Sequence, residues 1–417
     1  MLKTLCAITA VISITAATAF PADWPNFHGP GRTNKSAETG LLKSWPAGGP
    51  RLIWTASNIG TGFSGAATAN GVVYTAGVRD NASFVFAFNT ADGKPLWETR
   101  VGSAWVADRA FARRYHGSRA TPTVAGGMVY FLSDAGILAA LDARTGAQRW
   151  NLNIQEKYDA PLPGFGYSES PLVIGDRIFV SPYGKKATIV ALDRNTGKPV
   201  WETKGIAGGA GYASPVAIQN SGLTQLVSFT DEFLYAVNAA DGKVLWTVPV
   251  TNSRKNNCND IVYHDGHVFA TSGYGRGALL VKLEPKTGGG VNATKVYDVT
   301  RMDNLHGGVI LHEGRLYGSG HESRGWFCLD FKTGRQIWNA PGKGSITFAD
   351  GMLYLYDEDH GTVSLARATP EKFEVVSSFT VPEGSFKSYH WAHPAVSHGV
   401  LYIRYADRLY AYDVKNR

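Results

Sequence analysis

The fold is decided by the stretch Phe88-Asn89-Thr90-Ala91-Asp92-Gly93-Lys94-Pro95-Leu96-Trp97, a phrase that returns along the chain. In each copy an apolar run leads to Asp or Asn, then to Thr-Gly or Asp-Gly, and ends at Trp. The copies are Leu141-Asp142 to Trp150, Leu192-Asp193 to Trp201, Val237-Asn238 to Trp246 and Leu329-Asp330 to Trp338. Successive Trp residues are 53, 51, 45 and 92 positions apart, and the last interval equals two periods of 46. A period of about 40 to 50 residues with strand-like content predicts a propeller.

Each period contains the signals of four short strands. A small-residue strand is followed by a Gly turn, an alternating strand such as Met128 to Leu132, a polar turn, a third strand and the Thr-Gly turn before the Trp strand. Four strands joined by hairpin turns form one antiparallel blade. Turn positions at 89, 142, 193, 238, 284, 330, 367 and 413 predict eight blades, although three of these copies lack the Trp.

The last copy, at Ala411 to Lys415, ends before its outer strand. Arg51-Leu52-Ile53-Trp54 carries a Trp without a preceding turn, so it is the candidate for the missing strand. Pairing the two ends closes the ring and removes a free sheet edge. The predicted fold is therefore an all-β, eight-bladed propeller of four-stranded antiparallel blades, closed by an N-terminal outer strand.

The phrase Leu-Asp-x-x-Thr-Gly-x-x-x-Trp resembles the repeat of the pyrroloquinoline-quinone (PQQ) type propellers. That family includes quinoprotein alcohol dehydrogenases and outer-membrane-protein assembly lipoproteins. The opening Trp24-Pro25-Asn26-Phe27-His28-Gly29-Pro30 also resembles the lead-in of secreted members. The resemblance implies that the repeat Trp residues dock between blades and that the Asp caps the turn. It is specific for fold and does not select an activity, since one fold hosts many functions.

Composition and the N-terminus set the compartment. The chain has 417 residues and a formal net charge of +7 without a dense basic run, so a nucleic-acid surface is not expected. Lys3, the apolar stretch 5–16 and Ala17-Thr18-Ala19 read as a signal peptide, which predicts export to the periplasm or the medium. We expect residues 1–19 to be the signal, 20–50 an extended lead-in and 51–417 the propeller. Cys258 and Cys328 remain after cleavage, and either one bridge or two buried thiols is compatible with the sequence.

The repeat phase assigns loops to two faces of the propeller. His264, His267, His312 and His398 lie in or beside the Gly turns and are read as solvated. The loops that enter the innermost strands converge on the other face, around the mouth of the central channel. These loops carry Arg, His, Tyr, Asn and Asp, and convergent polar groups at one concavity predict a ligand site.

Candidate catalytic residues at the mouth are those able to act as acid or base, namely Tyr115, His116, His306 and His393. Candidate ligand-binding residues are Arg114, Arg119, Tyr167, Glu169, Tyr212, Asn257, Asp260, Arg276, His321, Arg324, His390 and Trp391. Cations outnumber acids among them, so an anionic or polyhydroxylated small ligand is expected. Arginines can hold a carboxylate, and the aromatic rings offer flat faces to a sugar.

Three functions remain open. The first is binding of an acidic sugar, with lyase catalysis in which Arg119 neutralises the carboxylate. The second is a PQQ-dependent alcohol or sugar dehydrogenase, which by family resemblance needs a calcium site. Glu169, Asn257 and Asp260 offer suitable oxygens, but the adjacent Cys-Cys pair and the long insertions of those enzymes are missing. The third is a protein-assembly scaffold. No metal ligand set is assigned, since His390-x-x-His393 is a weak zinc or copper signal.

Overall fold

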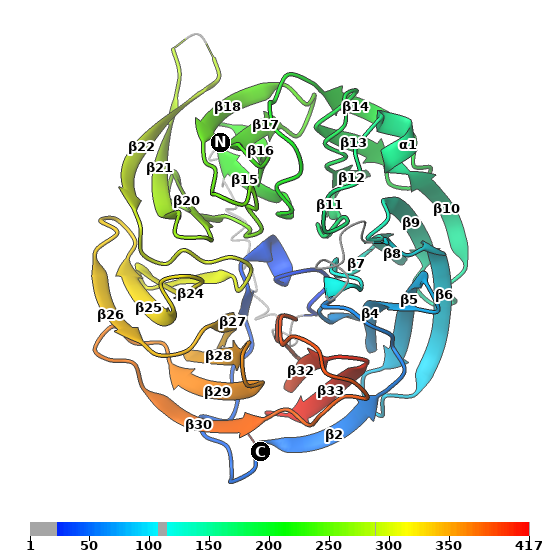
Figure 1. Ribbon diagram of the computed structural model, residues 1–417, viewed down its shortest axis with the longest axis vertical. Coiled ribbons are helices and arrows are strands. Elements are labelled where there is room, and N and C mark those ends of the chain that lie inside the picture. The colour runs from blue at the N-terminus through cyan, green and yellow to red at the C-terminus, as the bar shows by residue number, and fades with distance from the viewer. Residues whose placement is uncertain (1–22, 107–114, 288, 417) are drawn as a thin grey trace, which may run out of the picture.

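The strands form a closed ring of blades (Figure 1). The computed structural model describes residues 23–106, 115–287 and 289–416. Within these residues the strands form eight sheets, seven of four strands and one of five. Each blade is an antiparallel meander that runs from the channel to the rim, and the predicted eight-bladed, all-β architecture is confirmed.

The blades follow one another in chain order around the ring. From the channel outward, the first four consist of β3 (Ala67–Ala69), β4 (Val72–Arg79), β5 (Ala82–Asn89) and β6 (Pro95–Ser103); β7 (Thr123–Ala125), β8 (Met128–Leu132), β9 (Ile137–Asp142) and β10 (Gln148–Asn153); β11 (Leu172–Ile174), β12 (Arg177–Val180), β13 (Ile189–Asp193) and β14 (Pro199–Thr203); and β15 (Val216–Asn220), β16 (Leu223–Phe229), β17 (Phe233–Asn238) and β18 (Val244–Pro249).

The second half of the ring repeats this plan. Its blades consist of β19 (Val262–His264), β20 (His267–Ser272), β21 (Gly277–Pro285) and β22 (Val291–Val299); β23 (Val309–His312), β24 (Arg315–Gly320), β25 (Gly325–Asp330) and β26 (Gln336–Ala340); β27 (Gly344–Ala349), β28 (Met352–Asp357), β29 (Thr362–Arg367) and β30 (Val375–Thr380); and β31 (Ala395–Ser397), β32 (Val400–Tyr405), β33 (Arg408–Asp413) and β2 (Arg51–Ala56).

The repeated phrase forms the joint between neighbouring blades. Asp142 caps its turn by accepting hydrogen bonds from the backbone N–H groups of Arg144 and Thr145 at 3.1 and 3.0 Å. Trp97 of the preceding blade donates from Nε1 to the carbonyl of Ala143 at 3.1 Å. Gly146 has φ +72°, and a Cβ there would lie 2.6 Å from the Trp97 ring, so only glycine fits. The docking role that the resemblance implies for Trp is therefore present in the structure.

The same contact recurs around the ring. Trp150, Trp201 and Trp338 donate to backbone carbonyls of the next blade at 3.0 Å. Trp246 differs and bonds Gln225 Oε1 of its own blade at 2.9 Å, because the copy that follows it is the weak one at 284. Between the blades lie apolar clusters, such as Tyr130, Leu132, Ile178 and Val180, which are fully buried.

The ring closes through strand β2. It pairs antiparallel with β33, with Arg51 opposite Asp413 and Ala56 opposite Leu409. Trp54 then docks on the first blade, donating to the carbonyl of Thr90 at 2.8 Å. The sequence prediction of closure by the N-terminal strand is confirmed, because β2 supplies the outer strand of the last blade and pairs with the edge of β33 that would otherwise be free.

Little of the described chain is helical. The α-helix α1 (Ile154–Tyr158) is capped by the Asn153 side chain, and a 3-10 turn, η1, spans Pro30–Arg32. None of the described helices has the length and apolarity needed to cross a membrane. Cys258 and Cys328 are free thiols, and only Cys328 is fully buried.

Candidate functional site

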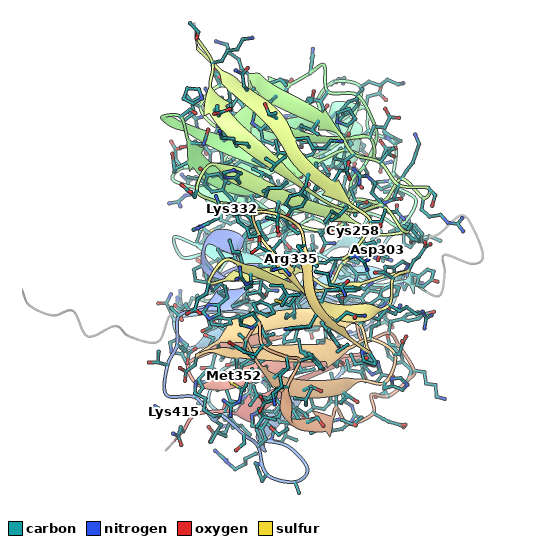
Figure 2. All side chains as sticks on the ribbon, turned by 90° about the vertical axis from the view of Figure 1, so that its left-hand side faces the viewer. Cys258, Asp303, Lys332, Arg335, Met352 and Lys415 are labelled. Carbon is teal, nitrogen blue, oxygen red and sulfur yellow. The ribbon has the colours of Figure 1, made fainter. Side chains whose placement is uncertain are left out.

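The loops of the propeller separate onto two faces as the repeat phase predicts. The loops that enter the innermost strands, and the turns between second and third strands, form what we call the mouth face. Figure 2 shows Cys258 and Asp303 on this side of the disc, whereas Lys332, Met352 and Lys415, from the Gly and Thr-Gly turns, lie toward the other. The loops that carry Cys258 and Asp303 therefore lie on the side that the repeat phase predicts for the channel mouth.

The N-terminal segment occupies the centre of the ring, which the sequence did not predict. We call residues 24–38 the plug. The chain passes into the channel from the turn face, where Asp23 contacts His398 at 2.7 Å, and crosses the centre as the dark blue segment in Figure 1. It then returns as β1 (Lys35–Ser36), which pairs in parallel with the inner strand β27. Part of the expected lead-in is thus an internal element of the propeller, whereas its later part runs to the outside, where the Trp45 N–H bonds Ser377 of β30.

The plug bonds to every one of the eight blades. On the first two blades, the N–H groups of Thr68 and Val124 donate to the carbonyls of Trp24 and Pro25. On the third and fourth, the carbonyls of Ser170, Pro171 and Pro215 accept from Arg32, and on the fifth Asp260 pairs with His28. On the last three, Leu311 accepts from Lys35, Phe348 donates to Asn34, and His393 bonds His28. One short segment therefore contacts the whole ring through its successive residues.

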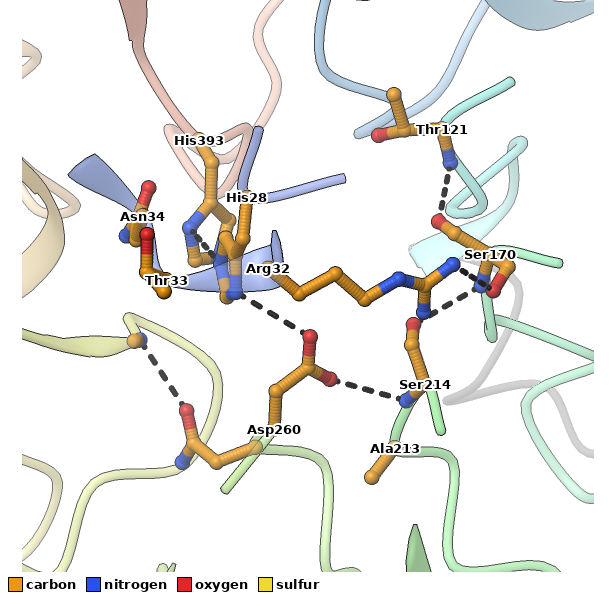
Figure 3. A network of polar contacts seen from close by, with 12 residues as sticks. His28, Arg32, Thr33, Asn34, Thr121, Ser170, Ala213, Ser214, Asp260 and His393 are labelled. Atoms are coloured by element: carbon orange, nitrogen blue, oxygen red, sulfur yellow. Dashed lines mark hydrogen bonds and ion pairs between the residues drawn. The ribbon is translucent and has the colours of Figure 1, made fainter. Parts of the chain in front are cut away.

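Two histidines and a carboxylate form a buried chain inside the channel (Figure 3). His393 Nε2 lies 2.5 Å from the carbonyl oxygen of His306, so this nitrogen carries a proton and donates. When His393 is neutral, its Nδ1 accepts from His28 Nε2 at 2.9 Å. His28 Nδ1 faces Asp260 Oδ2 at 3.3 Å, with both side chains almost fully buried. Asp260 therefore ends this chain of side-chain contacts.

Burial and the neighbouring His28 lower the pKa of His393 well below its ordinary value. His393 is consequently neutral at pH 7, as the hydrogen-bond chain requires. Both of its ring nitrogens are engaged within the protein, so they do not face a ligand. This placement argues against the catalytic role expected for His393, because an acid or base must reach the reacting atoms.

Arg32 provides the positive charge at the centre of the ring. It donates to the carbonyls of Ser170, Pro171 and Pro215 at 2.8, 2.7 and 3.1 Å, and it is 4 % exposed. Burial lowers the pKa of Arg32, and the negative charges of Asp260 and Glu169 partly oppose this shift. The guanidinium therefore supplies the cation for these two carboxylates.

The calcium site of the dehydrogenase alternative does not fit these residues. Glu169 Oε1 accepts from the backbone N–H of Ser181 at 2.6 Å, and Asn257 Oδ1 accepts from Ser272 at 2.7 Å. Asp260 is held by His28 and by the N–H of Ser214. One oxygen of each residue accepts a hydrogen bond from the protein, whereas the second carboxylate oxygens of Glu169 and Asp260 accept none from the described residues. The buried Arg32 guanidinium interacts with both carboxylates, and a cation already present there disfavours calcium. Among the described residues, no group of three or more His, Cys, Asp or Glu side chains is placed to hold a metal.

An aromatic shelf lies at the mouth. It is defined by Trp391, Tyr389 and Tyr115. Trp391 stacks on Tyr389 with ring centroids 4.5 Å apart and on Tyr115 at 5.4 Å, both at 18°. All three side chains are partly exposed. Flat, amphipathic rings of this kind suit the apolar face of a sugar.

A charged cluster adjoins the shelf through His306. The His306 ring lies 4.9 Å from that of Trp391, and its Nε2 is 3.9 Å from Glu358 Oε2. Lys343 forms an ion pair with the other oxygen of Glu358, and both of these side chains are 11 % exposed. Burial lowers the pKa of His306, with Glu358 opposing, so His306 is neutral near pH 7. Burial also acts to raise the pKa of Glu358, but His306 and Lys343 outweigh it and hold that pKa below its usual range.

Arg324 is the exposed cation of this region. It makes no hydrogen bond or ion pair with any residue that the structure describes. It lines a surface hollow of about 380 Å³ with Lys343 and Asp359, formed by loops of the sixth and seventh blades. Lys343 joins this hollow to Glu358 and His306, so the hollow and the aromatic shelf are linked by direct contacts.

Arg119 has a supporting place rather than an open one. It donates to the carbonyls of Gly117 and Phe165 at 3.3 and 2.7 Å, and also to that of Tyr115. Burial lowers its pKa. These bonds fix two mouth loops and hold Tyr115 beside Trp391. The expectation that Arg119 neutralises a substrate carboxylate is therefore not supported by its contacts.

The other predicted residues divide between the interior and the rim. Tyr167 is buried and donates to Pro182, Asn257 donates to two backbone carbonyls, and Arg276 pairs with Asp298 on the fifth blade. Partly exposed positions are held by His116, Tyr212, His321 and His390. Arg114 lies outside the described residues. The ligand roles of all these side chains stay predictions.

Three important positions were not predicted as site residues from the sequence: His28, Arg32 and Glu358. His28 and Arg32 lie outside the repeat and Glu358 lies in a polar turn of the seventh blade, and each acquires its partners only in the folded ring. A usable signal exists for Arg32, since Gly29 and Gly31 flank Pro30 just before it. Gly29 has φ +70°, and a Cβ there would lie 2.7 Å from the Trp24 ring. Glycine permits this left-handed backbone conformation and the close packing on Trp24, which a segment confined within a narrow channel needs.

Comparison with known proteins agrees with the architecture. The family model described as "Outer membrane protein assembly factor BamB" matches residues 46–166 and 155–340. The assembly factor of that name from Yersinia pestis is 24 % identical over 286 residues, covering 65 % of this chain and 67 % of that protein. The quinoprotein ethanol dehydrogenase of Pseudomonas aeruginosa is 25 % identical over 246 residues, covering 54 % of this chain but 38 % of the dehydrogenase.

Solved structures resemble the fold at lower identity. BamB from Moraxella catarrhalis has a TM-score of 0.59 at 17 % identity, covering 87 % of this chain and 99 % of that chain. The quinohemoprotein alcohol dehydrogenase of Comamonas testosteroni has a TM-score of 0.63 at 12 % identity, covering 95 % and 81 %. These likenesses support the propeller and leave activity open.

Proposed function

The chain belongs to the PQQ-like propeller family described as outer membrane protein assembly factor BamB, and from this premise we propose that it is an exported protein that binds an acidic saccharide at its channel mouth. Residues 1–19 act as the signal, 20–50 as the lead-in that includes the plug, and 51–417 as the propeller. The protein works in the periplasm or outside the cell. The names of its relatives, which include an outer-membrane assembly factor, favour this compartment.

The observation that carries the proposal is the junction of an aromatic shelf with an unpaired cation. The partly exposed Trp391 contacts His306, and Arg324 and Lys343 line the hollow, which Lys343 connects to His306 through Glu358. A uronate presents the matching chemistry, since its ring has an apolar face and its carboxylate accepts bidentate bonds from arginine. The Lys343 charge is largely balanced by Glu358, so Arg324 is the principal anchor.

Lyase catalysis is a finer part of the same proposal. A base removes the proton α to the uronate carboxylate, a carbon–carbon double bond forms, and the glycosidic C–O bond breaks with its electrons on the leaving oxygen, which takes up a proton. Neutral His306 is the candidate base, with Glu358 orienting its ring, and Tyr115 is the candidate acid. His116 remains an alternative base. Quinone-dependent oxidation is not proposed, because the buried Arg32 cation interacts with the carboxylates that would hold its calcium.

Calorimetric titration with an oligogalacturonate tests the binding function. We expect binding to the wild type, with a neutral oligosaccharide of equal length binding at least tenfold more weakly. Arg324→Ala should lose about tenfold in affinity, consistent with one charge-assisted interaction of about 1.4 kcal/mol. Arg149→Ala is the matched control, because Arg149 is an exposed cation of an outer strand. Equal affinity for charged and neutral oligosaccharides would reject the proposal. Ultraviolet absorbance of unsaturated product then tests the lyase step.

A second candidate function is protein assembly, favoured by the family description and by exposed apolar side chains. Val106 is 66 % exposed, Phe386 40 % and Leu162 37 %, and all three are in mouth-face loops. A photo-crosslinking residue at position 386 in the cell envelope would identify a partner. A defined partner whose capture is lost on Val106→Ser and retained in Arg324→Ala would favour assembly over saccharide binding.

A further inference from the structure

The plug and the proposed mouth site share one contact. His393 donates to the backbone carbonyl of His306, and its other nitrogen accepts from His28 of the plug. His306 is the residue that joins the charged cluster to the aromatic shelf. A displacement of the plug therefore acts directly on the loop that carries His306.

We propose that the plug is a proton-sensitive latch, in which the His28–His393 hydrogen bond holds both the plug and the His306 loop in place at neutral pH and is broken by acid. In naming His306 as part of the mouth, the inference rests on the proposed function. The latch itself depends only on contacts within the chain. His28 and His393 are positioning residues, because each acts through His306 and not on a ligand.

The geometry leaves one place for an added proton. His393 Nε2 already donates to the His306 carbonyl, so a second proton must bind at Nδ1. That nitrogen accepts the hydrogen of His28 Nε2 at 2.9 Å, and protonation turns the bond into two N–H groups facing each other. The added positive charge also lies beside the His28–Asp260 pair, whose carboxylate faces the other ring nitrogen of His28.

The charged surroundings on all sides of His393 do not offer a compensating anion. His28 faces it from the plug and His306 from the loop before β23, and the ring of Phe27 lies 4.9 Å away. Asp260 contacts His28 and also interacts electrostatically with Arg32. Glu169 interacts with Arg32 in the same way. Glu358 contacts the far side of His306 and is paired with Lys343. Protonated His393 therefore has no free carboxylate to contact among the described residues.

The direction of the pH effect follows from linkage. Burial lowers the folded-state pKa of His393 well below its ordinary 6.5, which the opened state regains. Opening therefore takes up a proton as the pH falls below about 6.5, and the open population rises about tenfold per pH unit. Above about 6.5 the latch has its full strength. The hydrogen bonds of Arg32 and Asn34 to backbone carbonyls involve no group that titrates in this range. Glu169 beside Arg32, whose pKa burial raises to about 7, takes up a proton in the same range, so a His393 variant is needed to separate the two effects.

Hydrogen exchange measured by mass spectrometry tests the latch without any ligand. Peptides covering residues 24–36 and 303–308 should lose protection together between about pH 7.5 and about pH 5.5, by roughly tenfold after correction for intrinsic exchange. His393→Gln retains an amide donor for the His306 carbonyl and removes the titrating group, so its protection should not change with pH. His264→Gln is the matched control, because His264 is exposed in a turn on the opposite face.

The outcomes are separable. Unchanged protection of residues 24–36 in acid, or an unaltered pH response in His393→Gln, overturns the latch. If the Gln variant does not fold, the pH series of Glu169→Gln decides, because this variant removes the other group that titrates in the interval and should keep the wild-type loss of protection. Oligogalacturonate titration at both pH values adds the link to the mouth: wild-type affinity should fall about tenfold in acid, and a pH-independent affinity would refute the coupling. Absence of binding at every pH rejects the proposed function and leaves the latch to be judged by exchange.

Discussion

Replacing Arg32 by Met tests how much the plug contributes to the stability of the ring. Arg32 is 4 % exposed, and its guanidinium donates to three backbone carbonyls on two blades. A methionine fills much of the side-chain volume but removes every donor. Each buried acceptor that loses its partner costs about 1–3 kcal/mol, and removing one member of a buried charged set costs about 3–5 kcal/mol. We therefore expect the free energy of unfolding to fall by about 3–5 kcal/mol.

Urea-induced equilibrium unfolding at pH 7.5, followed by tryptophan fluorescence and by far-ultraviolet circular dichroism, measures this loss. Arg32→Lys retains the charge, but one ammonium cannot reproduce the planar fork that reaches all three carbonyls, so it should lie between wild type and Met. Arg149→Met is the matched control: Arg149 is 57 % exposed and pairs with Asp142, so we expect a change below about 1 kcal/mol. An Arg32→Met variant within about 1 kcal/mol of wild type, at unchanged denaturant slope, would refute the central role of the plug.

Two further predictions concern the blade joints and the buried carboxyl. Trp201→Ala removes a ring that lies 5.8 Å from Phe179 and donates to the Ala239 carbonyl, so thermal and urea unfolding should show a loss of about 3–4 kcal/mol; a loss below about 1 kcal/mol would contradict the docking role. Burial raises the pKa of Glu169 to about 7 from its ordinary 4.5, so wild-type folding binds a proton in that interval and this carboxyl's contribution to stability falls as the pH rises through it. Glu169→Gln cannot ionise and should gain up to about 3 kcal/mol relative to wild type between about pH 4.5 and about pH 7; a stability difference that is independent of pH would show that Glu169 has an ordinary pKa.

The sequence predicts the ring well because its determinants are local and repeated. The Asp142 cap, the left-handed Gly146 and the docked Trp97 are all encoded within one phrase, and each copy reports independently on the period. The closing strand β2 could be identified because the last copy of the repeat ends before its outer strand, and the N-terminal segment carries a Trp strand without a preceding turn.

The plug could not be predicted in the same way, because its contacts join residues far apart in sequence. His28 and His393 are separated by 365 positions, and Arg32 meets Ser170 across 138. Its partners are largely backbone carbonyls, which carry no side-chain signature. The mouth was predicted in outline, since loop phase places its residues on one face, but phase alone does not distinguish an exposed Arg324 from an Arg119 bound to three carbonyls.

The central claim is that the N-terminal segment lies inside the channel against the inner strand β27. Asn34 and Thr347 are neighbours there, with Thr347 Oγ1 3.1 Å from Asn34 Oδ1 and the Phe348 N–H bonded to the Asn34 carbonyl. Mild oxidation of Asn34→Cys/Thr347→Cys, mapped by mass spectrometry, should join these two positions by a disulfide in nearly all folded molecules. Two free thiols at these positions in a folded, oxidised sample would contradict the account.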